Sequence, residues 1–152
     1  MFRRPGSPIY SSSFSPGGRF LVSGDSSGSI CKWRIRDGYK EILMPSGSFL
    51  CLSVGFSPNG RYIASAHFNG VLRIWDARTN HLLHRWVGPL EHAYCLAFTP
   101  DGNGLVSGGK DKTLKYWDVS SLVHSQPGQR PVVDGSKFEQ ILRFEGHTVR
   151  CS

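Results

Sequence analysis

The sequence predicts an all-β fold made of three repeats, each with four short strands. The first observation is the composition, because 18 glycines, 9 prolines and 12% aromatic residues favour short strands joined by turns over long helices. The second is a gapless internal repeat with a period of 42 residues, typical of a unit of several strands. The repeated aromatic residues are Phe14, Phe56 and Phe98, and Trp33, Trp75 and Trp117.

Four strands can be assigned in each repeat, in order. An apolar stretch ending at the phenylalanine predicts the first strand, and a Ser/Thr-Pro-x-Gly turn follows it. The second strand is RFLVSG, RYIASA or NGLVSG, with small residues at its end where a neighbour must approach closely. Tight turns at 26–28, 68–70 and 110–112 lead into a third strand that reaches the tryptophan. The fourth strand is expected at 41–44, 82–86 and 138–144, and four strands per repeat are typical of a β-propeller blade.

The repeat divides the chain into blades. We expect an N-terminal tail over 1–8, blades over 9–45, 46–87 and 88–145, and the first strand of a fourth blade over 146–152. The third blade carries a polar loop insertion at about 120–137. Because propellers close with about 4–8 blades, this predicts an open arc whose ring needs further blades. The uncovered flanks predict poor solubility or association of the isolated chain.

The charge and composition exclude several classes of protein. With 39% hydrophobic and 19% charged residues, the chain is too apolar for a disordered tail, and it has no apolar run of the ~20 residues that a spanning helix needs. The basic N-terminus precedes no apolar stretch, which excludes a signal peptide. The net charge of +7 comes mainly from residues 1–40, without a continuous basic run, and indicates a mildly basic solvated surface.

No motif indicates catalysis, a cofactor or a metal. The segment at 104–111 resembles a phosphate-binding loop, but Asp111 replaces the Ser or Thr and no helix follows. His81 and His84 would point to opposite faces of a strand. The cysteines at 31, 51, 95 and 151 form no Cys-x-x-Cys pair, so we expect reduced thiols in an intracellular protein.

The repeats resemble the WD40 family. Trp75-Asp76 and Trp117-Asp118 match its name-giving dipeptide, and Gly146-His147 matches the Gly-His that opens a repeat. The resemblance covers about residues 9–152. The third repeat, LAFTPDGNGLVSGGKDKTLKYWDVSSL, resembles fungal Tup1-like (Groucho/TLE-type) transcriptional co-repressors, which also carry a polar insertion after this tryptophan.

The resemblance implies a hydrogen-bonded His–Ser/Thr–Asp–Trp set within each blade, and this chain departs from it. Ser27, Asn69 and Asp111 stand at the aspartate position, and Pro5, Gly47 and Pro89 stand at the histidine position. The third repeat keeps Ser107, Asp111 and Trp117, with His92 as a possible substitute for the histidine; His147 belongs to the fourth repeat. We therefore expect the blades to depend on apolar packing.

The resemblance also implies a protein-binding surface on the loops around one mouth of the propeller. The matching residues here are Ser26, Leu50, Phe68, His92 and Lys110. The alternative for Leu50 and Phe68 is burial between blades.

The leading functional hypothesis is a non-catalytic nuclear scaffold that resembles a co-repressor. Its implied partners are DNA-binding repressors, histone tails and subunits of co-repressor complexes, with no membrane contact and only indirect contact with nucleic acid. The alternative is a generic WD40 adaptor in a ubiquitin-ligase or RNA-processing assembly, with a cytoplasmic location as the alternative. A third hypothesis is direct binding of RNA or DNA through the basic first repeat, with affinity that falls steeply with salt.

Overall fold

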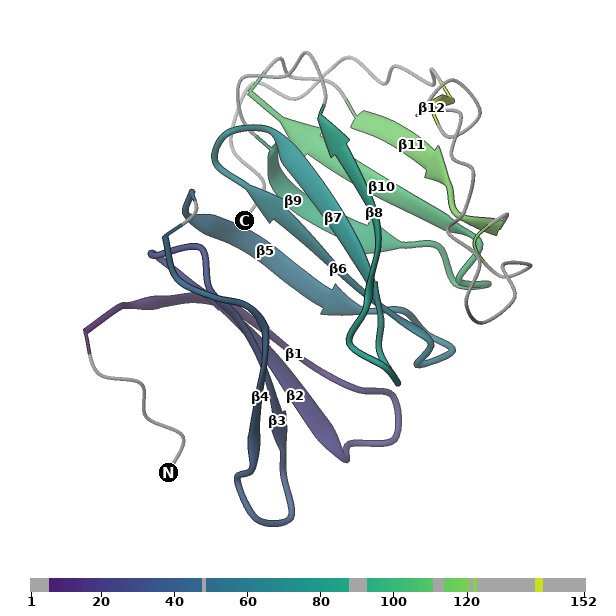
Figure 1. Ribbon diagram of the computed structural model, residues 1–152. Coiled ribbons are helices and arrows are strands. Elements are labelled where there is room, and N and C mark those ends of the chain that lie inside the picture. The colour runs from purple at the N-terminus through teal and green to yellow at the C-terminus, as the bar shows by residue number, and fades with distance from the viewer. Residues whose placement is uncertain are drawn as a thin grey trace.

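A computed structural model describes residues 6–47, 49–87, 93–110, 114–120, 122 and 139–140. These residues form three four-stranded antiparallel sheets and no α-helix, which confirms the all-β prediction (Figure 1). The first sheet contains β1 (Ile9–Phe14), β2 (Phe20–Asp25), β3 (Ile30–Arg34) and β4 (Lys40–Met44). The second contains β5 (Cys51–Phe56), β6 (Tyr62–His67), β7 (Val71–Asp76) and β8 (Leu82–Val87). The third contains β9 (Ala93–Phe98), β10 (Gly104–Gly109), β11 (Leu114–Asp118) and β12 (Glu139–Gln140).

Each sheet is a meander, because strands consecutive in sequence pair with one another. The Ser/Thr-Pro-x-Gly turns join the first two strands of each sheet, and Gly18, Gly60 and Gly102 take φ values of 70°, 72° and 75° there. A hydroxyl fixes each turn; in the first sheet Ser15 Oγ accepts a hydrogen bond of 3.0 Å from Phe20 N. The turn chemistry read from the sequence therefore sets the strand pairing.

The three sheets pack in chain order, so that the second lies between the first and the third (Figure 1). Val22 and Ile30 of the first sheet pack on Ile63 and Trp75 of the second. A second apolar cluster fills the next interface. It contains Ile74, Leu72 and Trp86 from the second sheet and Leu105, Trp117 and Val119 from the third. This arrangement is an open arc of propeller blades, as the repeat predicts, with the core between blades.

The fourth strands were placed correctly in the first two blades, apart from one residue at an end. In the third blade, β12 begins within the expected 138–144, whereas 141–144 lie outside the described residues. Most of the polar insertion at 120–137 and the whole segment at 146–152 also lie outside them. Within the described part of the chain, no helix has the length and hydropathy to cross a membrane.

The small residue Gly24 near the end of β2 allows close approach between the first two blades, and the group that approaches it is the side chain of Cys51. A Cβ atom on Gly24 would overlap Cys51 Sγ of the second blade and lie 2.9 Å from its Cβ. Cys31 and Cys51 are free, buried thiols, and burial raises the pKa of Cys51 to about 12. Cys95 is disulfide-bonded, so the expectation of four reduced thiols was wrong; the spacing along the chain gave no signal for it.

Candidate protein-interaction surface

Two of the predicted mouth residues, Leu50 and Phe68, are joined by a backbone hydrogen bond at one edge of the second blade. At this edge, the turn between the second and third strands lies beside the segment that enters the blade. Phe68 N donates to Leu50 O at 2.9 Å, and Ser26 N donates to Pro8 O at 2.9 Å. The two donors are 42 positions apart, and so are the two acceptors, so the repeat builds the same edge in both blades. We call this edge of the second blade, formed by Phe49, Leu50 and Phe68, the aromatic edge.

The aromatic edge is accessible. The Phe68 side chain is 41% exposed and that of Phe49 is 58% exposed, whereas Leu50 is half-buried. Burial of Phe68 between blades, the alternative considered from the sequence, is therefore wrong. Ser26 is half-buried at the matching position of the first blade, and Lys110 is exposed at the end of β10. His92 lies outside the described residues.

His67 holds the aromatic edge in place and was missed by the sequence analysis. Its imidazole is fully buried, with Nδ1 3.0 Å from Phe49 O and Nε2 2.9 Å from Ser65 Oγ. Burial lowers the pKa of His67 to about 4, so the ring is neutral near pH 7. The histidine lies at the end of β6, 20 residues after Gly47, which stands at the histidine position of the family, so the family pattern gave no signal for it.

Asp25 occupies the repeat position of His67 in the first blade and has a related role. Its Oδ1 accepts hydrogen bonds from Ser27 N at 2.9 Å, Ser27 Oγ at 2.6 Å and Ser29 N at 3.1 Å. The first blade thus has a carboxylate two residues before Ser27, the residue at the aspartate position of the family. In the third blade the aspartate position of the family holds Asp111, which lies outside the described residues, as does His147.

Two of the three repeated tryptophans donate the hydrogen bond to serine that the resemblance to the family implies. Trp33 Nε1 donates to Ser23 Oγ at 2.9 Å, and Trp117 Nε1 donates to Ser107 Oγ at 2.8 Å. All three tryptophans are buried; Trp75 is 2% exposed. These hydrogen bonds join the second and third strands of a blade, and in the third blade the Trp117 ring packs on Trp86 of the second blade.

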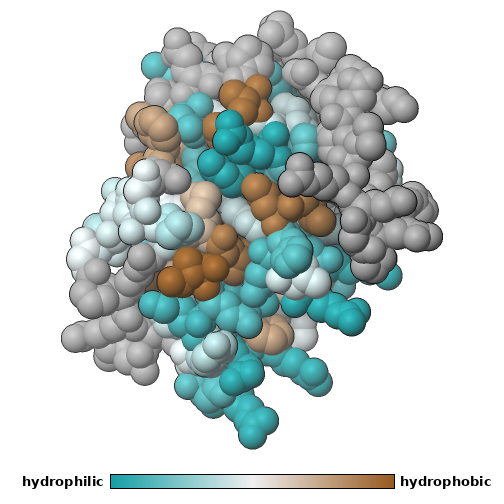
Figure 2. Space-filling view, in the orientation of Figure 1, coloured by the Kyte–Doolittle hydropathy of each residue, from teal (hydrophilic) through white to brown (hydrophobic). Residues whose placement is uncertain are grey.

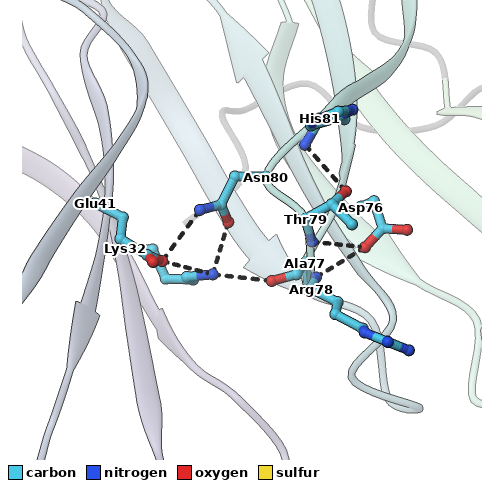
Figure 3. A network of polar contacts seen from close by, with 8 residues as sticks. All are labelled: Lys32, Glu41, Asp76, Ala77, Arg78, Thr79, Asn80 and His81. Atoms are coloured by element: carbon cyan, nitrogen blue, oxygen red, sulfur yellow. Dashed lines mark hydrogen bonds and ion pairs between the residues drawn. The ribbon is translucent and has the colours of Figure 1, made fainter.

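A polar network joins the first two blades at the opposite edge (Figure 3). Lys32 Nζ lies 2.8 Å from Glu41 Oε2, and donates to Ala77 O at 2.9 Å and to Asn80 Oδ1 at 2.6 Å. Asn80 Nδ2 also donates to Glu41 Oε2, at 3.1 Å. These hydrogen bonds, with that of Lys32 first, lower the pKa of Glu41. The network fixes the β7–β8 turn against the first blade.

The described residues considered for a phosphate-binding loop or for metal binding lie in strands or directly beside them. Residues 104–109 are strand β10. His84 is half-buried, with its ring edge-on to Trp86 at a centroid distance of 4.5 Å, while His81 is exposed just before β8. Among the residues that the structure describes, no group of three or more His, Cys, Asp or Glu side chains could hold a metal ion.

Known proteins similar to this chain share its repeat and its fold. The family described as WD domain, G-beta repeat matches residues 2–34, 43–76 and 81–118. No curated protein matches the chain. Two similar solved structures are "Crystal structure of RRP9 WD40 repeats" and "Structure of U3-55K", each with a TM-score of 0.79 and 22% identity. The match covers 98% of this chain and 42% of each of those chains, so this chain spans less than half their length. With three matched repeats and three stacked four-stranded sheets, the chain belongs to the WD40 repeat family.

Proposed function

We propose that this chain is a non-catalytic scaffold that binds short protein segments at its aromatic edge, as a nuclear co-repressor propeller does. Its partners in this proposal are segments of DNA-binding repressors, histone tails and subunits of a co-repressor complex. The observation that supports it is the exposure of Phe49 and Phe68 on a backbone that His67 holds rigid. Exposed aromatic side chains on a fixed backbone bind partners at a low cost in conformational entropy.

Lys110 is the residue of the third blade at the repeat position of Phe68, and its exposed side chain places a positive charge there. A segment that combines an apolar anchor with acidic residues would complement both the aromatic edge and Lys110. Burial of one aromatic anchor is typically the largest single contribution to such an interface.

The experiment is a titration of labelled repressor-derived and histone-tail peptides by fluorescence anisotropy. Phe49→Ala and Phe68→Ala should each weaken binding by about 2 kcal/mol, and Lys110→Glu should weaken binding of acidic peptides. Tyr39→Ala is the matched control, because Tyr39 is 57% exposed and lies at the opposite edge. Equal affinity of wild type and both phenylalanine variants would exclude this surface. Binding of repressor peptides but not of ubiquitin-ligase or RNA-processing components separates the co-repressor function from that of another adaptor.

A further inference from the structure

Exposed arginines recur at matched positions of the first two blades, at the edge opposite to the aromatic edge. Arg19 and Arg61 are 42 residues apart and end the β1–β2 and β5–β6 turns, while Arg36 and Arg78 are 42 apart in the β3–β4 and β7–β8 turns. All four are exposed. The third blade has Asn103 and Ser120 at these two positions. The fold therefore does not require arginine there, and we call the four residues the arginine edge.

Backbone contacts make the arginine edge continuous. Ile35 N donates to Arg19 O and Ala77 N donates to Arg61 O, each at 2.9 Å, which places the two turns of each blade side by side. Between the blades, the Lys32 network holds the β7–β8 turn against the first blade. The β1–β2 and β5–β6 turns also meet, since a Cβ on Gly60 would lie 3.7 Å from Pro16 Cδ. Figure 2 shows hydrophilic residues gathered over the hairpin tips of the first sheet, at the bottom of the view.

The carboxylates beside the arginine edge offset only part of its positive charge. Asp37 is engaged by Arg34, whose Nη2 lies 2.6 Å from Asp37 Oδ2, and Glu41 is engaged by Lys32. Asp76 Oδ1 accepts from Arg78 N at 2.8 Å and from Thr79 N at 3.1 Å. Within the ranges that the structure describes, no member of the arginine edge forms an ion pair with these carboxylates. Four guanidinium groups therefore face solvent along one edge.

An aromatic ring accompanies the arginines. Tyr39, in the β3–β4 turn, is 57% exposed, and the Arg34 guanidinium lies 5.1 Å from its ring centroid. Guanidinium groups match the geometry of phosphate oxygens, and an exposed aromatic ring offers a surface on which a base can stack. An acidic protein would pair with the arginines, but its carboxylates would make no stacking contact with the Tyr39 ring. The combination favours a nucleic acid over an acidic peptide.

We propose that the arginine edge binds single-stranded nucleic acid through its phosphate backbone, with a base stacked on Tyr39. This site lies at the other edge from the aromatic edge, so a partner could occupy each at the same time. The proposal does not depend on the co-repressor-like function. It predicts little sequence preference, because phosphates carry no sequence information and every base has a face that can stack.

The test is fluorescence anisotropy of the full 152-residue chain with labelled oligouridylate and oligothymidylate of about 16 nucleotides. Four phosphate contacts predict a Kd that rises about 50-fold between 50 and 200 mM salt. Replacing all four arginines by serine should abolish most of this salt dependence, and Tyr39→Ala should weaken binding about tenfold. Arg85→Ser is the control, because Arg85 is exposed on β8 away from this edge and its replacement should leave Kd nearly unchanged.

The outcomes are distinct. Equal binding of both oligomers identifies the shared backbone as the ligand, and preference for the ribose form identifies RNA; both support the proposal. Unchanged Kd in the fourfold variant, an equal loss in Arg85→Ser, or no binding at 50 mM salt would overturn it. Displacement of the oligomers by an equal charge concentration of polyglutamate would assign the edge to acidic proteins and would also overturn it. Matching circular dichroism spectra of the variants show that they are folded, and Phe68→Ala should have no effect on these measurements.

Discussion

Lys32 Nζ lies 2.6 Å from Asn80 Oδ1, across the interface between the first two blades. The residue 42 positions after Lys32 is Ile74, a fully buried apolar side chain in the next interface. The same repeat position thus joins one pair of blades by a buried charge and the other pair by apolar packing. A buried charge is strongly destabilising when its partners are lost, which makes this interface sensitive to single substitutions.

Lys32→Ala should lower the free energy of unfolding by about 3 kcal/mol, because it removes a buried cation with three partners and leaves Asn80 and Glu41 facing one another. Glu41→Gln leaves the buried Lys32 ammonium without this anionic partner and should also destabilise, by about 1–2 kcal/mol. The cost is smaller than for Lys32→Ala because the amide oxygen can still accept from Lys32 Nζ and the Glu41 side chain is 38% exposed. Urea denaturation measures both. Asn80→Gly, which tolerates the φ of 62°, completes a double-mutant cycle with Lys32→Ala. Fully additive effects would show that the two residues are not coupled.

Gly24→Ala should destabilise the interface by about 2 kcal/mol, since the added methyl group overlaps the Cys51 side chain. Cys51→Ala in the same chain removes Sγ and should restore part of that loss. Thermal unfolding of the two single variants and the double variant measures the coupling. Gly17, around which a Cβ would meet nothing within 4 Å, is the matched control position for alanine.

The neutral His67 should make stability depend on pH. Its pKa is about 4 in the folded protein, below the usual 6.5, so the unfolded chain binds the proton more tightly. The stability that this group contributes is complete above about pH 6.5 and is lost as pH falls toward 4, by about 2 kcal/mol between pH 7.5 and 5. His67→Gln should lack this component. The difference in unfolding free energy between wild type and His67→Gln should therefore shrink with acidification; a constant difference would contradict the assignment.

Ser107→Ala should lower stability by about 1–3 kcal/mol, because it removes the acceptor of the buried Trp117 indole N–H. Trp117→Phe removes the donor as well as part of the apolar contact with the second blade. Ser107→Ala should therefore lower the free energy of unfolding much less in the Trp117→Phe background than in the wild type. Equal costs in both backgrounds, measured by urea denaturation, would show that the hydrogen bond contributes nothing.

The chain should associate through the face of the first blade that points away from the second. On this face, which also carries Trp33, Phe14 is 63% exposed and Ile42 is 53% exposed. Sedimentation velocity over a range of concentrations should show self-association, and Phe14→Ser with Ile42→Ser should reduce it. Leu82→Ser, which changes a residue 50% exposed on β8, is the control. A monomer at all concentrations would contradict this prediction.

The structural roles that could be predicted from the sequence are those of residues that recur in every repeat. Phe14, Phe56 and Phe98 align at a spacing of 42, and with the turn glycines they predicted the strands and their pairing. The resemblance to the family assigned Leu50 and Phe68 to one face, and a backbone hydrogen bond joins these two residues. The roles of His67 and Asp25 could not be predicted, because this repeat position holds a histidine, an aspartate and a glycine, and the histidine and the aspartate bind different groups.

The series of four-stranded blades could be predicted from the residues alone, since turn chemistry and alternation act locally along the chain. The side chains that meet between blades could not: Cys51 against Gly24, Lys32 against Asn80, and the arginines of two blades on one edge. Contacts within a blade are set by short hairpins, whereas the Gly24–Cys51 and Lys32–Asn80 contacts join residues 27 and 48 positions apart. A repeat fixes where equivalent backbones lie, and the non-repeated side chains then decide whether an interface is apolar, charged or open to a partner.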